Sequence, residues 1–174
     1  MFAASLFLLY TVTMRIKAEI KWKEISYLSA HRKGGITLSQ YKILSSDLGK
    51  EPYFLYNYAA ELYAEKQYSE CLFIANKCRL YWADYSLELM QAETLFKLKQ
   101  YEQAEVHFNK AKLMCPARFI PLYRLYQIYQ IQKKKRTAIQ LAEEIVNKTV
   151  KVNSITIQLI KAEMKSKLST CDLQ

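Results

Sequence analysis

Few side chains in this sequence are spaced as a catalytic or metal-binding site requires. The two histidines, His31 and His107, stand alone, and the position of His107 between Val106 and Phe108 on an expected helix favours a packing role. The sequence lacks a glycine-rich phosphate loop, an HExxH pair and a CxxC pair. We therefore predict that the protein is not an enzyme and holds no cofactor or metal.

The four cysteines do not have the spacing of metal ligands either. Cys71 and Cys78 are seven residues apart, which on a helix is about 10 Å along one face and too far for a disulfide. We expect small buried side chains, and unpaired thiols favour a reducing compartment.

Basic residues are concentrated at both ends of a chain whose formal net charge is +10. Residues 1–50 carry a net +5, residues 51–118 a net −1 and residues 119–174 a net +6. A protein that binds nucleic acid is expected to carry its positive charge on a central face. Because the charge lies at the two ends instead, we predict that the protein does not bind nucleic acid. It favours an anionic surface or simple solubility.

One basic run stands in an expected turn between helices, and two interpretations of it remain open. It is either a solvated loop or a contact with anionic lipid headgroups, worth roughly 1 kcal/mol per residue near the surface. The run consists of Lys133, Lys134, Lys135 and Arg136.

The elements that must position these residues are helices, because three Gly and three Pro supply too few turns for an all-β fold. Apolar residues at helical spacing predict a helix from Ile16 to His31, ended by Arg32–Gly35, and a second helix over Thr37–Ser46. Gly49–Pro52 should break the chain again.

The middle of the chain repeats with a period of 33 to 34 residues. Lys66-Gln67-Tyr68 returns as Lys99-Gln100-Tyr101, and Ala138 follows Ala104 at 34 residues. The clearest unit, Tyr85–Arg118, reads as two helices with small residues where they touch, and Pro116 ends the second. Such periods predict an all-α solenoid of helix-turn-helix repeats.

After Asn147 the pattern predicts an extended link and a final helix to Leu168, begun by Asn153 or Ser154, that caps the last repeat. Its inward residues should be Ile157, Ile160 and Met164. The expected organisation is an apolar segment over residues 1–14, a degenerate first repeat over 15–50, repeats over 51–146, and the link and capping helix over 147–174.

The hairpins resemble tetratricopeptide repeats (TPRs). Counted from Tyr85, the unit matches five of six signature positions, and the exception is Glu88, which we expect to be partly exposed. The copies from Pro52 and Phe119 match less well, and the former has Ala83 where the helix-breaking proline belongs. The resemblance implies a scaffold that binds a protein or peptide.

In TPR arrays the first helix of each repeat lines a concave groove, so the resemblance also implies the binding residues. An aromatic groove suits an extended peptide or an amphipathic helix. The alternative is that these aromatic side chains only pack against neighbouring repeats. The implied groove residues are Tyr53, Tyr56, Tyr63, Glu93, Phe96, Lys97, Tyr123 and Gln127.

Residues 2–14 are uncharged and mostly apolar, and basic residues follow from Arg15 onward. As a helix this segment is about 20 Å long, short of the roughly 30 Å hydrocarbon core. It is the end of a membrane helix that begins upstream, an apolar helix that packs on the domain or a partner, or a degenerate signal. A membrane end would favour the cytoplasmic side.

Residues 54–62, 114–129 and 147–164 resemble the C-terminal TPR region of bacterial O-antigen polymerase and ligase-like membrane proteins, in which an opening helix carries a tryptophan like Trp22. The resemblance implies a non-enzymatic scaffold for cell-envelope glycan assembly at the cytoplasmic side of the bacterial inner membrane. A soluble adaptor remains the alternative, with its N-terminal helix docked on its own groove or on a second copy. The oligomeric state stays open.

Overall fold

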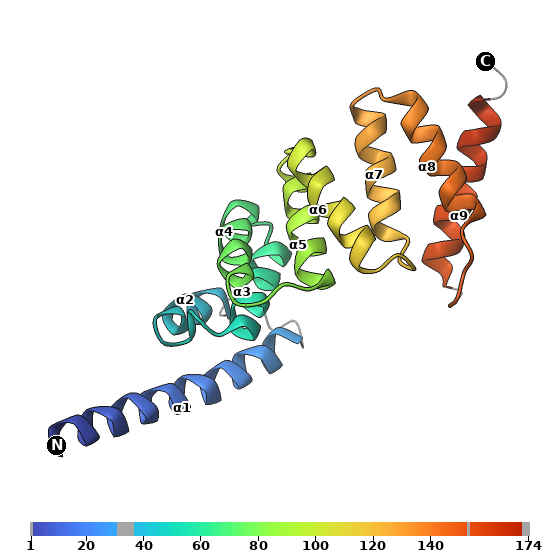
Figure 1. Ribbon diagram of the computed structural model, residues 1–174. Coiled ribbons are helices and arrows are strands. Elements are labelled where there is room, and N and C mark those ends of the chain that lie inside the picture. Colours follow the sequence, from blue (N-terminus) through green and yellow to red (C-terminus); the bar gives the residue numbers. More distant parts are fainter. Residues whose placement is uncertain (1, 31–36, 153, 172–174) are drawn as a thin grey trace. The chain divides into compact units, whose positions relative to one another are not determined.

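The computed structural model describes residues 2–30, 37–152 and 154–171, and within these ranges every regular element is an α-helix (Figure 1). The chain divides into two compact units, residues 1–83 and residues 84–174. In chain order the helices are α1 (Phe2–Ala30), α2 (Thr37–Leu48), α3 (Pro52–Ala64), α4 (Tyr68–Arg79), α5 (Tyr85–Lys97), α6 (Tyr101–Met114), α7 (Ile120–Ile131), α8 (Lys135–Asn147) and α9 (Ile155–Cys171).

The turn inside each hairpin has one recurring geometry. Lys66, Lys99 and Lys133 adopt the left-handed backbone region, with φ of 60°, 60° and 58°. The amide after each lysine then donates to a carbonyl five residues earlier in the preceding helix, which satisfies groups that a helix end leaves without a partner. These bonds are Gln67 N to Leu62 O at 2.8 Å, Gln100 N to Leu95 O at 2.9 Å, and Lys134 N to Tyr129 O at 2.9 Å.

The helices break next to Pro52 and Pro116, as the sequence predicted. α2 ends at Leu48 and α3 begins at Pro52, while α6 ends two residues before Pro116. Asp84, which the sequence reading did not single out, caps α5 by accepting the Leu87 amide at 2.8 Å. The stop predicted at Arg32–Gly35 lies outside the described residues.

The core of the first unit is aromatic. Tyr41 on α2 stacks on Tyr58 of α3 at 5.4 Å and meets Phe54 at 5.5 Å between ring centroids. Cys71 and Cys78 are fully buried on α4, as the sequence predicted, and Cys78 Sγ donates to Pro52 O at 3.3 Å. α1 contacts α2 and α3, so these helices share one core.

Among the α1 side chains that the structure describes, the buried ones are Ala18 and Ile25, which lie in the later part of the helix. Its apolar N-terminal part extends past α2 (Figure 1), and Leu6 to Tyr10 are 61–70 % exposed. Arg15 Nη2 lies 3.3 Å from Glu51 Oε2, and this ion pair joins α1 to the start of α3. No helix in the described ranges is both long enough and apolar enough to cross a bilayer.

The second unit is built on the close contact of α5 and α6. The small residues predicted at this contact, Ala92, Ala104 and Ala111, are fully buried. Glu88 is only 1 % exposed, so the expectation of a partly exposed glutamate was wrong. The reason is a polar partner inside the hairpin, because Glu88 Oε2 lies 2.7 Å from His107 Nδ1.

The capping helix α9 packs on α8 as α7 packs on α6, so α9 takes the place of the first helix of a further repeat. Ile160 and Met164 are its buried residues. Ser154 caps the helix by accepting the Ile157 amide at 3.3 Å. Lys161 Nζ donates to Val146 O at 2.9 Å and to Lys148 O at 2.6 Å, which ties the preceding link to α9.

Candidate functional site

Arg124 on α7 organises the polar face between the first helices of the second unit. Its Nε donates to Glu93 Oε1 on α5 at 2.7 Å, and its Nη1 donates to Gln127 Oε1 at 2.8 Å. The guanidinium carbon also lies 5.2 Å from the centroid of the Phe96 ring. Three of the predicted groove residues thus share one arginine that the sequence reading missed. Its spacing of three residues from Gln127, typical of one helix face, was the available signal.

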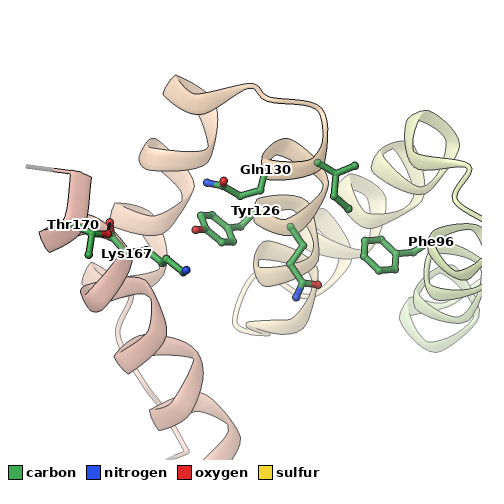
Figure 2. A pocket seen from close by; sticks show the side chains of 7 residues that line it. Phe96, Tyr126, Gln130, Lys167 and Thr170 are labelled. Carbon is green, nitrogen blue, oxygen red and sulfur yellow. Dashed lines mark hydrogen bonds between the residues drawn. The ribbon is translucent and has the colours of Figure 1, made fainter. Parts of the chain in front are cut away.

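A pocket of about 470 Å³ lies beside this cluster, between α5, α7 and α9 (Figure 2). Figure 2 shows Tyr126 and Gln130 on α7, Phe96 on α5, and Lys167 extending from α9 toward α7. The pocket therefore combines aromatic walls, side-chain amides and one ammonium group. Its lining residues are Phe96, Tyr126, Gln127, Gln130, Ile131, Lys167 and Thr170.

Tyr123 connects α7 to α9 instead of facing a free groove. Its hydroxyl donates to Glu163 Oε2 at 2.8 Å. Burial and then the adjacent Glu163 carboxylate raise the pKa of Tyr123, which keeps the hydroxyl protonated as a donor. Lys97, also predicted in the groove, is exposed at the end of α5 and does not line the pocket.

The predicted groove residues of the first unit form a separate aromatic cluster. Tyr53 and Tyr56 both contact Trp82, at 5.3 Å and 5.6 Å between ring centroids. Tyr63 meets Tyr68 edge-on at 5.5 Å. Trp82 was missed because the repeat pattern assigns a role after the second helix to the helix-breaking position alone, here Ala83. Tyr53 remains 60 % exposed, so packing does not fully account for it.

The basic run is divided among several local roles. Lys134 lies 3.7 Å from Glu105 Oε2, and its ammonium lies 5.4 Å from the Tyr129 centroid. Lys133 supplies the left-handed turn. Lys135 and Arg136 begin α8, and all four side chains are exposed. Contact with lipid headgroups stays a prediction.

Neither a family model nor a curated protein matches the sequence. Among the solved structures that are similar to the chain, two match it over most of its length. MamA 41-end from Desulfovibrio magneticus RS-1 has a TM-score of 0.72 and 19 % identity, over 88 % of this chain and 88 % of that one. A MamA RS-1 ArsTM double mutant has a TM-score of 0.71 and 19 % identity, over 87 % of this chain and 84 % of that one.

At this identity the likeness concerns the fold alone, and it adds no support for the O-antigen ligase-like resemblance. The similarity extends over both units of the chain. The fold is an all-α, tetratricopeptide-type solenoid with a C-terminal capping helix, as the sequence predicted.

Proposed function

We propose that this protein is a non-enzymatic scaffold that holds a peptide segment of another protein in the pocket between α5, α7 and α9. The observation that carries the proposal is the pocket itself, whose lining combines Phe96, Tyr126 and Ile131 with the amides of Gln127 and Gln130. Small-molecule sites in proteins are mostly apolar concavities of roughly 300–1,000 Å³ with a few placed polar groups, and this pocket has a similar size and lining.

The helices that form the pocket are held by fixed polar contacts. Glu93 and Arg124 join α5 to α7, and Tyr123 and Glu163 join α7 to α9. Because these contacts already order the helices, the protein loses little conformational entropy when a peptide binds in the groove. A binding role is therefore favoured over a purely structural one for Phe96 and Gln127.

Site-specific photo-crosslinking in cells tests the proposal. A photoreactive side chain at the exposed Gln130 of the pocket should give one or a few discrete crosslinked products. The same group at the exposed Gln140 of α8, outside the pocket, is the matched control. Phe96→Ala should abolish the Gln130 products. Identical products at Gln130 and Gln140, or none at Gln130, would count against a peptide-binding groove.

We also propose that the N-terminal part of α1 associates with a membrane. Leu6 to Tyr10 are exposed on all sides of the helix, and a helix that is apolar all round requires an apolar environment. Arg15 and Lys17 follow it and are exposed, as expected beside anionic headgroups. The bacterial inner membrane, on its cytoplasmic side, is the proposed location.

Vesicle flotation tests this association. The full chain should float with vesicles of phosphatidylglycerol and phosphatidylcholine, and Leu6→Glu with Leu9→Glu should prevent it. Lys133→Glu with Lys135→Glu measures the separate contribution of the basic turn. Flotation unaffected by the first pair of changes would exclude the α1 segment as the anchor.

A role in cell-envelope glycan assembly is a narrower proposal that rests on the sequence resemblance of residues 54–62, 114–129 and 147–164. A soluble adaptor is the second candidate, favoured by the same exposed segment if it docks on the groove of its own or a second chain. Sedimentation velocity distinguishes docking on a second copy from docking on the same chain. If the segment docks on a second copy, Leu6→Glu with Leu9→Glu should convert dimers to monomers.

A further inference from the structure

We propose that the pocket between α5, α7 and α9 selects a peptide segment that carries a carboxylate next to an apolar side chain, and that Lys167 recognises the carboxylate. The inference rests on the proposed peptide-binding function and adds the chemistry of the partner. Lys167 is the charged residue among those that line the pocket. It extends from α9 toward the aromatic wall on α7 (Figure 2).

The Glu93 and Glu163 carboxylates on the surrounding helices each have one oxygen bound to another side chain, while Glu93 Oε2 is buried without a hydrogen bond to any described residue. Glu93 on α5 pairs with Arg124 at 2.7 Å, and Glu163 on α9 accepts the Tyr123 hydroxyl at 2.8 Å. Among the described residues none forms an ion pair with Lys167. None of the described side chains therefore neutralises the positive charge that Lys167 presents in the pocket, and an anionic ligand complements this charge.

Other lysines near this end of the unit make contacts that Lys167 does not make with any described residue. Lys161 on the same helix donates to Val146 O and Lys148 O and fixes the link before α9. Lys134 pairs with Glu105 and lies over the Tyr129 ring. Against this background, a lysine that lines a pocket and has no ion-pair partner among the described residues points to an external one.

The third hairpin also departs from the first two at the pocket wall. Tyr63 meets Tyr68 in the first hairpin, and Phe96 meets Tyr101 at 5.6 Å in the second. The corresponding residues of the third hairpin are Gln130 and Lys135. Loss of this aromatic pair places an amide at the pocket, where it can donate to the same carboxylate or to the peptide backbone.

The apolar part of the specificity comes from Phe96, Tyr126 and Ile131, which line the same pocket. A purely acidic peptide would leave these groups in contact with water, and a purely apolar one would desolvate Lys167 without compensation. The basic turn that follows Ile131 adds positive potential at this end of α7, which steers acidic segments toward the pocket.

Fluorescence anisotropy on the full chain tests the inference with three labelled peptides: alternating aspartate and leucine, the same sequence with asparagine, and the same sequence with lysine. At low ionic strength the aspartate peptide should bind about fivefold more tightly than the asparagine peptide, and added salt should reduce this ratio. Lys167→Gln should abolish the preference. Lys165→Gln, the same charge change on an exposed residue of α9 outside the pocket, should retain it.

The outcomes separate the inference from the proposed function. Equal binding of the aspartate and asparagine peptides, both weakened by Phe96→Ala, would overturn carboxylate selection while leaving a peptide-binding groove in place. Equal losses with Lys165→Gln and Lys167→Gln would overturn the role of Lys167 in favour of general charge attraction. If no peptide binds at about 1 mM and no crosslink forms at Gln130, both proposals fail.

Discussion

Glu88 Oε2 and His107 Nδ1 lie 2.7 Å apart between α5 and α6, in side chains that are 2 % and 15 % exposed. An apolar residue is expected at position 88 from the repeat pattern, so the second hairpin replaces part of its hydrophobic contact with a polar one. Such a contact orients the two helices, but it is sensitive to the loss of either partner.

The buried pair predicts an asymmetric response to mutation. His107→Leu should lower the free energy of unfolding by about 2–4 kcal/mol, because it removes the His107 contact from the buried Glu88 carboxylate. Glu88→Leu should cost less, because His107 is closer to solvent. The double variant should recover most of the loss. Urea unfolding followed by circular dichroism measures all three, and a double variant whose loss equals the sum of the two single losses would show that the pair contributes nothing.

The left-handed lysines predict a stabilising substitution. Lys99 has a φ of 60°, a conformation that costs a non-glycine residue about 1 kcal/mol. Lys99→Gly should raise the free energy of unfolding by about 0.5–1 kcal/mol. Lys165→Gly, at an exposed position inside α9, is the matched control and should lower it by a similar amount. Destabilisation by both changes would mean that the turn is not strained.

Arg124 is predicted to couple stability to binding. Arg124→Met should cost about 2 kcal/mol because Glu93 is largely buried and loses its cation. Arg124→Lys should be intermediate, since an ammonium cannot reproduce the planar contacts to Glu93, Gln127 and Phe96. Urea unfolding and the crosslinking yield at Gln130 should fall in the same order. An unchanged crosslinking yield at Gln130 in Arg124→Met would show that the contacts of Arg124 are not needed for binding in the groove.

Two tyrosines predict a loss of stability at high pH. Burial and then the neighbouring Glu105 raise the pKa of Tyr129 to about 12, and burial and then Glu70 raise the pKa of Tyr58 to about 12. A raised folded-state pKa stabilises the fold fully below the unfolded value, near 10, and this contribution disappears as pH rises toward 12. Tyr129→Phe with Tyr58→Phe should flatten the decline in unfolding free energy over this range. An unchanged slope would contradict the assignment.

The sequence predicted the hairpins well because their determinants are local. Small residues at Ala104 and Ala111, breaks at Pro52 and Pro116, and the repeated Lys-Gln-Tyr each act within one or two helical turns. Glu88 was misread because its partner lies nineteen residues away on another helix. Only the packing of that hairpin determines whether such a glutamate meets a histidine or water.

The candidate site was only partly predictable, because it depends on α9. The groove positions Phe96 and Gln127 followed from the repeat pattern, and both line the pocket. Lys167 and Tyr126 did not, since the pattern treats the final helix as a cover and position 126 as a packing residue. Tyr123 was expected to face a partner, but it bonds Glu163 once α9 lies beside α7.

The lysine in each hairpin turn allows the local stability of the repeats to be measured by proteolysis. Lys66, Lys99 and Lys133 each provide a trypsin cleavage site at the turn of a hairpin, 33 and 34 residues apart. A protease requires an extended backbone, so each of these turns must open before it is cut, and under gentle digestion the rate of each cleavage reports the local opening of its own hairpin. Mass spectrometry of the fragments would therefore rank the repeats by local stability without any label.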